Sequence, residues 1–316
     1  MLTVLDPVTR RGRELCEALT EALPDQAHTY FHTSGTDEHL LAEVAGQARL
    51  VRPLDDLDEL ARCTALILTA PPAPAIAARL AAWLDSQPTL LVVDYSLPPV
   101  LPAGQAAAFG MLREPRPGAR RLQALDPALS GPSVVLDALT HLGLISTHLT
   151  LLTPAADAGD EAVEELAGQA VARLSGARPP RAQRLPGVVA FDAGPVSSAR
   201  HAHLCAQALQ LGLPTVPSVT AVATSAFHGH LAAVTVGLDT ERRRSELEAA
   251  LRRRPQLQIV RPGKLGMVSA VVGDERVRCG EIVGGERSWS LLLAFDGGQL
   301  VGPATVVDLL ARLTAA

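Results

Sequence analysis

Residues 125–133 have the composition of a tight loop that leads into a helix, a place where an enzyme can seat a nucleophile or an oxyanion. A helix N-terminus offers free N–H groups and the positive end of the helix dipole. The loop contains no Cys and no His, so its one hydroxyl nucleophile is Ser130. A serine nucleophile needs an adjacent base, and none lies beside it in sequence. We therefore predict that Ser130 is the N-cap of a helix over 133–142, with Pro132 at an early position.

Two pairs of histidines have a spacing that invites comparison with metal ligands. His228 and His230 join two predicted strands, and residues two apart on a strand share a face. His201 and His203 lie on a predicted helix, where residues two apart do not share a face. No Asp, Glu or Cys completes either site at ligand spacing, and the four cysteines form no CxxC. We predict no metal site, no zinc ribbon and no disulfide framework.

Length and composition predict a cytoplasmic protein of two domains. The 316 residues are enough for two domains of ordinary size, and 47% apolar residues can supply their cores. A formal charge of -5 and an aromatic content of 3% give no reason to expect nucleic acid. Prolines and Arg79 interrupt the apolar window 64–84, so we expect a strand, a turn and a helix there and no membrane span. The chain starts without a basic region or a long apolar run, so we expect no signal peptide.

The first part of the chain alternates short apolar runs with amphipathic segments. This alternation predicts a parallel sheet covered on both faces, which binds ligands at the carboxyl ends of its strands. We expect strands over 2–5, 29–31, 48–51, 64–69 and 89–93, helices over 14–23 and 75–84, and an irregular stretch over 97–118.

From residue 145 the predicted strands are longer and the helices fewer, which favours a second α+β domain with a mixed or antiparallel sheet. The periodic helix over 160–174 carries apolar residues on one face and acidic residues in its first turn. We expect strands over 148–152, 188–191, 218–227, 232–238, 268–272, 276–282 and 288–295, and helices over 160–174, 196–211, 240–254 and 303–313.

Four segments carry recognisable motifs in a fixed order: 125–139, 153–174, 221–236 and 288–313, the most specific being Phe227-His228-Gly229-His230. In the order of these motifs the chain resembles the aspartate-semialdehyde dehydrogenase family, and most closely its non-catalytic bacterial homologues that lack the active-site cysteine. The resemblance implies an α/β protein with a Rossmann-type NAD(P)-binding-like domain over 1–127. It further implies an α+β catalytic-like and dimerisation domain over 128–296, and a C-terminal helix over 297–316 that packs on the first domain. Active members reductively dephosphorylate aspartyl phosphate through a cysteine thioester, with a histidine as acid and base.

Aligned with the family's catalytic motifs, the chain keeps the histidine and loses its partners. The Asn-Pro-x-Cys pattern places Leu129 at the nucleophile, and leucine cannot form a thioester. The catalytic glutamine position holds Thr153, which has no amide donor and acceptor pair. His230 occupies the acid/base position, although a histidine without a nucleophile is also explained by a hydrogen bond at a strand end.

The substrate and cofactor positions are degraded in the same comparison. Ala223 replaces the substrate arginine, so no bidentate grip on a carboxylate is possible there, while Arg200 remains as a cation on the substrate helix. The glycine-rich dinucleotide loop maps onto 6–12, where only one of its glycines survives. The cofactor contacts that the resemblance still implies are weak and fall on Thr9, Arg10, Arg11 and Gly12.

We therefore predict a catalytically degenerate, aspartate-semialdehyde dehydrogenase-like protein that acts as a dimeric structural, regulatory or partner-binding homologue. We expect a homodimer, no nucleic acid, no membrane, and no cofactor, or NADP if the cofactor site works. The alternative is an active NAD(P)-dependent oxidoreductase acting on an aldehyde or acyl phosphate. Its remodelled site would involve Arg10, Arg11, Arg200 and His230.

Overall fold

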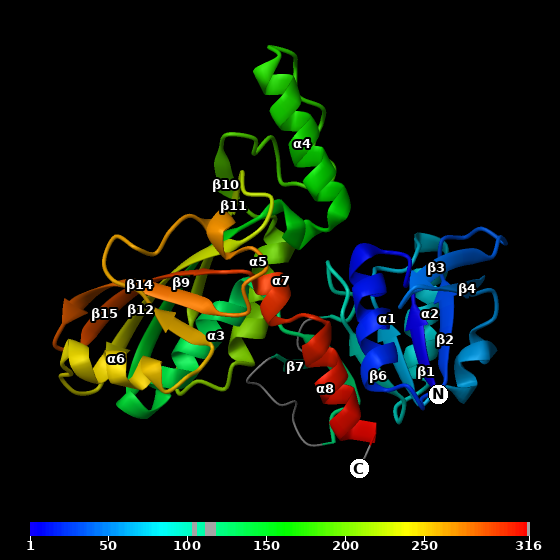
Figure 1. The fold of residues 1–316 in the computed structure, drawn as a ribbon, viewed down its shortest axis with the longest axis horizontal. Coiled ribbons are helices and arrows are strands. Elements are labelled where there is room, and N and C mark those ends of the chain that lie inside the picture. The colour runs from blue at the N-terminus through cyan, green and yellow to red at the C-terminus, as the bar shows by residue number, and fades with distance from the viewer. Residues whose placement is uncertain (103–105, 111–117, 315–316) are drawn as a thin grey trace. The chain divides into compact units, whose positions relative to one another are not determined.

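The computed structural model describes residues 1–102, 106–110 and 118–314, which divide into two compact units. Unit 1 contains the described residues up to 124 together with 302–314, and unit 2 contains 125–301 (Figure 1). The chain thus changes unit after 124 and again after 301, where the sequence placed the boundaries at 127 and 296. Part of the predicted irregular stretch over 97–118 lies outside the described residues, and a short strand lies within the rest.

Unit 1 is built on an eight-stranded sheet in the order β3-β4-β2-β1-β5-β6-β8-β7, in which the described pairings are parallel except for the β3–β4 hairpin. Its strands are β1 (Leu2–Leu5), β2 (His28–His32), β3 (Leu40–Val44), β4 (Gln47–Pro53), β5 (Ala65–Leu68), β6 (Leu91–Asp94), β7 (Ala107–Phe109) and β8 (Arg121–Ala124). Its helices are α1 (Arg10–Ala22), α2 (Pro74–Asp85), α8 (Pro303–Thr314) and the 3-10 helix η1 (Leu57–Arg62).

Both faces of this sheet are covered, which explains why every residue of β1, β5 and β6 is buried and most of them are apolar. On one face α1 and α8 pack side by side, and Leu15 of α1 and Leu310 of α8 are fully buried in the same core cluster. On the other face α2 and η1 bury Leu80 and Leu60. The last helix of the chain therefore belongs to the core of unit 1.

Unit 2 is built on a seven-stranded mixed sheet in the order β10-β11-β9-β12-β15-β14-β13. Its strands are β9 (Leu144–Thr153), β10 (Ala193–Pro195), β11 (Ser218–Thr224), β12 (His230–Leu238), β13 (Leu257–Ile259), β14 (Val277–Gly285) and β15 (Ser288–Phe295). Its helices are α3 (Pro127–Leu139), α4 (Asp160–Leu174), α5 (Ser198–Leu209), α6 (Arg244–Arg252), α7 (Gly297–Leu300) and the 3-10 helices η2 (Thr140–Leu142), η3 (Ala155–Ala158) and η4 (Val268–Val271). A parallel-rich sheet and a mixed sheet confirm the predicted α/β fold class.

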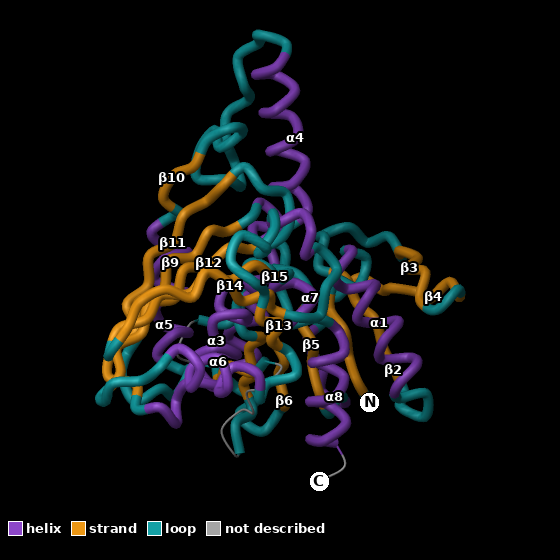
Figure 2. The backbone as a smooth tube through the Cα atoms, turned by 60° about the vertical axis from the view of Figure 1, so that its left-hand side comes forward, coloured by secondary structure: helices purple, strands orange, loops and turns teal. Residues whose placement is uncertain are grey.

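Helix α3 is the buried helix on which unit 2 is organised. It packs on β9, β12 and β15, which lie side by side in Figure 2, and on α6 and α7. The approach to β15 is close, since a Cβ atom on Gly131 would lie 2.6 Å from the ring of Phe295. Glycine at 131 therefore lets the helix backbone reach the end of β15.

Two predicted strands of unit 2 are wrong. Residues 188–191 form no strand: the chain turns at 190–191, where Phe191 has a φ of +59°, outside the strand region. Residues 268–271 form the 3-10 helix η4, which lies between two glycines with positive φ, Gly266 and Gly273. Short strands such as β10 and β13, three residues each, were not predicted. No helix in the described ranges has the length and apolar character needed to cross a membrane.

Candidate functional site

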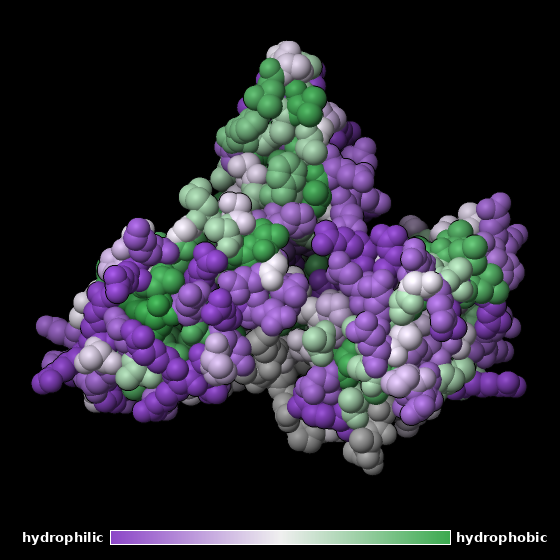
Figure 3. All heavy atoms as spheres, viewed as in Figure 1, coloured by the Kyte–Doolittle hydropathy of each residue, from purple (hydrophilic) through white to green (hydrophobic). Residues whose placement is uncertain are grey.

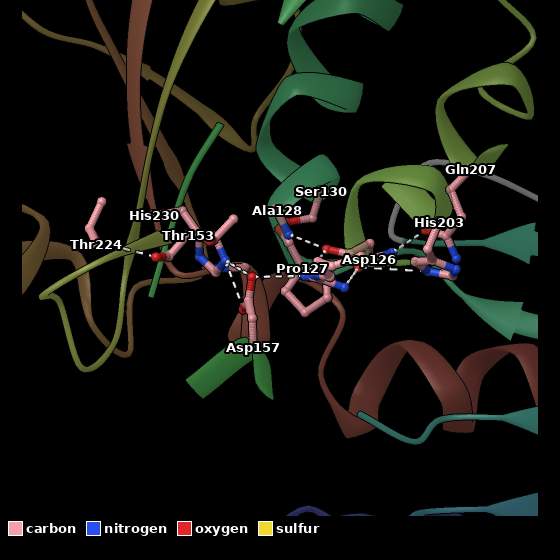
Figure 4. Close-up of polar contacts among 12 residues, drawn as sticks. Asp126, Pro127, Ala128, Ser130, Thr153, Asp157, His203, Gln207, Thr224 and His230 are labelled. Atoms are coloured by element: carbon pink, nitrogen blue, oxygen red, sulfur yellow. Dashed lines mark hydrogen bonds and ion pairs between the residues drawn. The ribbon is translucent and has the colours of Figure 1, made fainter. Parts of the chain in front are cut away.

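His230 begins β12 and both of its ring nitrogens are bonded within unit 2 (Figure 4). The backbone N–H of Gly297 donates to Nδ1 at 3.2 Å, so Nδ1 is an acceptor and the ring proton lies on Nε2. Nε2 donates to Asp157, 3.0 Å from Oδ1 and 3.1 Å from Oδ2. The ring stacks on Phe295 at 5.1 Å and is only 3% exposed. Neither nitrogen is left to act as acid or base on a substrate without breaking one of these bonds.

Asp157 links the histidine to a buried arginine. It lies in η3, directly after β9, and its side chain is 7% exposed. Nη2 of Arg200 donates to Asp157 Oδ2 at 3.0 Å. Burial alone would raise the pKa of Asp157, but the charges and hydrogen bonds of His230 and Arg200 outweigh it, so the pKa is lowered from its ordinary value. Asp157 is therefore an ionised carboxylate at neutral pH.

Arg200 bridges two carboxylates. It lies in the first turn of α5, which starts at the N-cap Ser197, and its guanidinium bonds both oxygens of Asp126 as well as Asp157. Burial would lower the pKa of Arg200, but Asp126 and Asp157 raise it above its ordinary value. The cation predicted at this position is present, but its guanidinium is already paired on two sides.

Asp126 is the most buried member of the network, and it also starts α3. Its side chain is fully buried and accepts from the backbone N–H of Ala128 at 3.0 Å, the geometry of an N-cap. Its own backbone N–H donates to Gln207 Oε1 at 2.6 Å. His203 Nε2 lies 3.7 Å from Asp126 Oδ2, within ion-pair distance when the ring is protonated.

The start of α3 corrects one prediction. Ser130 is not the N-cap: it lies within α3, and its Oγ donates to the carbonyl of Pro127 at 2.7 Å. In the structure the N-cap is Asp126 and Pro127 is the first helical residue, so the helix starts six residues earlier than predicted. Leu129 lies on the first turn of this helix and is fully buried.

Thr153 and Ala223 end two neighbouring parallel strands. They are Cα partners in the register of β9 and β11, and both are buried. Thr153 Oγ1 donates to the carbonyl of Val222 at 3.2 Å, so its hydroxyl is used between the strands. Figure 4 shows Thr153 beside His230, so the structure brings these two predicted positions together at one end of the sheet.

The loop between β1 and α1 uses its donors within unit 1. Thr9 caps α1, because its Oγ1 accepts from the N–H of Gly12 at 3.1 Å. A Cβ atom on Gly12 would lie 2.8 Å from Pro7 Cα and 2.9 Å from Thr69 Oγ1, so glycine is required for close packing of helix and strands. Pro7 has no N–H to give. The loop thus has the packing glycine of a dinucleotide motif, but the N–H of that glycine donates to the Thr9 cap and is not free for a phosphate.

The two arginines of this loop are also engaged. Arg10 forms an ion pair with Glu14 at 2.9 Å on the exposed face of α1. Arg11 donates from Nε to the carbonyl of Tyr95 at 2.7 Å, and its guanidinium lies 3.7 Å above the centre of the Tyr95 ring. Both side chains therefore have partners within the chain that a bound phosphate would have to replace or share.

Sequence reasoning missed the residues that complete the network around His230. Asp157 stands in the glutamine-type segment 153–159 but replaces no catalytic residue of the family, so the motif comparison passed over it. Gln207 and Phe295 act through contacts with residues far away in sequence. The signal for Asp157 was an acidic side chain among small residues directly after an apolar strand. In the described parts of the chain, no group of three or more His, Cys, Asp or Glu is placed to hold a metal ion.

Several solved structures match this chain along nearly its full length. Aspartate semialdehyde dehydrogenase II from Vibrio cholerae, complexed with ASA, matches with a TM-score of 0.82 at 15% identity, over 99% of this chain and 98% of that one. A probable aspartate-semialdehyde dehydrogenase from Pseudomonas aeruginosa gives 0.80 at 17% identity, with coverage of 99% and 98%. The enzyme from Candida albicans with NADP gives 0.66 at 11%, again covering 99% and 98%.

No protein-family model matches the sequence, and no curated protein matches it either. At identities of 11% to 17% the structural likeness is evidence of shared architecture. The chain has the fold of the aspartate-semialdehyde dehydrogenases.

Proposed function

We propose that this chain is a non-catalytic protein on the aspartate-semialdehyde dehydrogenase fold, with a structural or regulatory role as a cytoplasmic homodimer. One observation carries the proposal. The retained histidine, His230, is held on one nitrogen by Asp157 and on the other by the N–H of Gly297, so its acid–base capacity is spent inside the protein.

The neighbouring positions support the same reading. Leu129, which the motif comparison places at the thiol, is a fully buried core residue. Arg200, the cation of the substrate helix, is already bonded to Asp126 and Asp157. A substrate carboxylate would have to displace one of two buried carboxylates to reach the guanidinium, which is costly because the displaced charge would lose its partner.

We propose further that the chain does not depend on NADP. A structure of the Candida albicans enzyme contains NADP, which makes it the cofactor to test. The loop that would cradle a pyrophosphate here fits it poorly, since Pro7 lacks a donor, the N–H of Gly12 is capped by Thr9, and the loop has lost its other glycines. No reaction step is assigned to the cofactor.

The homodimer is supported by an apolar surface of unit 2. Val171 and Leu174 of α4 are 67% and 78% exposed, and Phe191 is 62% exposed. Figure 3 shows hydrophobic atoms along the part of unit 2 that carries α4, at the top of the view. Exposed apolar side chains that gather into one patch commonly mark an interaction surface. Light scattering is expected to give twice the chain mass; a monomer at high concentration would remove this part of the proposal.

The catalytic part is tested with purified protein and two measurements. Fluorescence titration with NADPH is expected to show no saturable binding in the micromolar range. The phosphate-dependent oxidation of aspartate semialdehyde is expected to stay at the no-protein rate, both for the wild type and for Leu129→Cys, because a thiol does not free His230. Turnover by the wild type would overturn the proposal in favour of the remodelled oxidoreductase. Turnover by Leu129→Cys alone would show that only the nucleophile had been lost.

A further inference from the structure

A polar pocket opens in unit 1 at the amino ends of its strands, away from the loop that follows β1. It has a volume of 480 Å³, within the range of about 300–1,000 Å³ typical of small-molecule sites. It is lined by Thr20, Pro24, Gln26, His28, Thr29, Tyr30, Arg49, Leu50 and Arg52. The residues come from the end of α1, the turn after it, and strands β2 and β4.

The pocket exists because β2 and β4 separate. The two strands pair only at Phe31 with Arg52 and at His32 with Pro53, near their carboxyl ends. Toward their amino ends, at His28 and Arg49, no pairing holds them together. The β3–β4 hairpin, drawn at the edge of unit 1 in Figures 1 and 2, supplies one wall, and the end of α1 supplies another.

One arginine of the pocket wall, Arg49, has no carboxylate partner among the described residues. Two arginines and a histidine line the pocket, and its lining contains no acidic residue. Arg52 is paired with Glu59 at 3.1 Å, but Arg49 forms no ion pair or side-chain hydrogen bond with any described residue. Burial first, and then the charges of Arg49 and of the chain N-terminus, lower the pKa of His28. The positive charge that repels a proton from His28 attracts an anion.

A donor or acceptor of the pocket is also unused. His28 Nε2 is buried and has no hydrogen-bond partner in the described structure. Buried polar atoms are normally paired, and each exception calls for an explanation such as a missing ligand. The centroid of the His28 ring lies 6.4 Å from that of Tyr30, edge to face, and both residues line the pocket.

We propose that this pocket binds a small organic phosphate monoester, with Arg49 as the primary charge contact and His28 and the neighbouring hydroxyl and amide groups as further donors. A phosphate monoester presents three terminal oxygens and up to two negative charges. It can therefore accept from a guanidinium and from several neutral donors at once, whereas a carboxylate has only two oxygens and one charge. The volume exceeds that of one phosphate and leaves room for a short polar organic group. This site is independent of the chemistry around His230 in unit 2.

Calorimetric titration of the full chain with glycerol 3-phosphate tests the proposal, with glycerol and glycerate as the uncharged and carboxylate counterparts. We expect saturable 1:1 binding of glycerol 3-phosphate. Arg49→Gln should weaken it at least about tenfold, the usual loss for a charge-assisted bond. Arg62→Gln, which removes an exposed charge of η1 outside the pocket, should leave it unchanged. In protein labelled with ¹⁵N-histidine, the ring signal of His28, assigned with His28→Gln, should move on titration.

The outcomes separate cleanly. Absence of saturable binding overturns the proposal, as does equal weakening by both arginine variants, which would indicate a general field effect. Binding that leaves the His28 signal unmoved places the phosphate elsewhere and also overturns it. Equal affinity for glycerate would reject the phosphate class. Arg49 is exposed, so its variant is expected to fold, and its circular dichroism spectrum verifies this.

Discussion

Replacing Arg200 by methionine removes the cation of the buried network while keeping a side chain of similar length. Asp126 and Asp157, with side chains 0% and 7% exposed, would then both lose the guanidinium that they share. Removing one partner of a buried ion pair typically costs about 3–5 kcal/mol, because the remaining charge stays desolvated. We expect a loss of this size in the free energy of unfolding of unit 2 at pH 7.

The cost of removing Arg200 should depend on pH, because it depends on whether the buried carboxyl groups are charged. In the wild type the pKa of Asp157 is lowered, so its stabilisation is complete above the unfolded pKa of about 4 and is lost only in acid. Removing Arg200 takes away its charge and its hydrogen bond, two of the contributions that lower the pKa of Asp157, so the pKa of this carboxyl is higher in the variant than in the wild type. The wild type therefore loses more of its stability than Arg200→Met as Asp157 is protonated, and the difference between them should be largest at pH 7–8 and shrink in acid.

Urea unfolding followed by tryptophan fluorescence measures the free energy of unfolding of unit 2 separately. A Trp83→Phe background leaves Trp289, which is buried in β15 of unit 2, as the reporter. Arg254→Gln is the matched control, because the Arg254–Asp137 pair is 39% and 46% exposed and should contribute below about 1 kcal/mol. A loss no larger than that of the control, or one that grows as pH falls, would refute the reasoning.

Three further changes follow from packing and burial. Gly131→Ala should destabilise unit 2 by about 1–3 kcal/mol, because its Cβ would lie 2.6 Å from a ring carbon; Gly168→Ala, with open space around its Cβ, should stabilise α4 slightly, and thermal melts compare the two. Asp157→Asn should flatten the acid side of the stability curve, because the lowered pKa of this carboxyl is the source of part of that slope; an unchanged slope would count against the network. Cys16 and Cys279, whose pKa burial raises to about 12, should resist iodoacetamide at pH 8 until the protein is unfolded, as mass spectrometry can show; native labelling would contradict their burial.

Much of the fold could be predicted because its signals are local. The periodic pattern over 160–174 predicted α4 with the bounds that the structure has, and the apolar run over 288–295 did the same for β15. The start of α3 was predicted wrongly, because Ser130 followed by Pro132 has the residue types of a helix start, while the structure uses Asp126 and Pro127, four residues before Ser130. Both pairs suit a helix start, so local residue type alone does not distinguish them.

The candidate site was less predictable because its bonds are long-range. Arg200 lies 74 residues from Asp126 and 43 from Asp157 in sequence, and no local pattern reports either pair. The resemblance located His230 and Arg200, but it described each by its role in an enzyme. What each side chain does here depends on which groups the tertiary structure places around it.

The network around Arg200 argues for a positional role of His230. A buried ion pair is weak evidence of stability, since apolar residues of the same volume commonly stabilise as well or better. Such a network fixes the relative positions of the segments that it connects. Here it connects five segments of unit 2: the start of α3 (Asp126), η3 (Asp157), α5 (Arg200), β12 (His230) and α7 (Gly297). The two ring nitrogens of His230 join β12 to η3 and to α7, so an acid–base role for this ring would break bonds that hold these segments together.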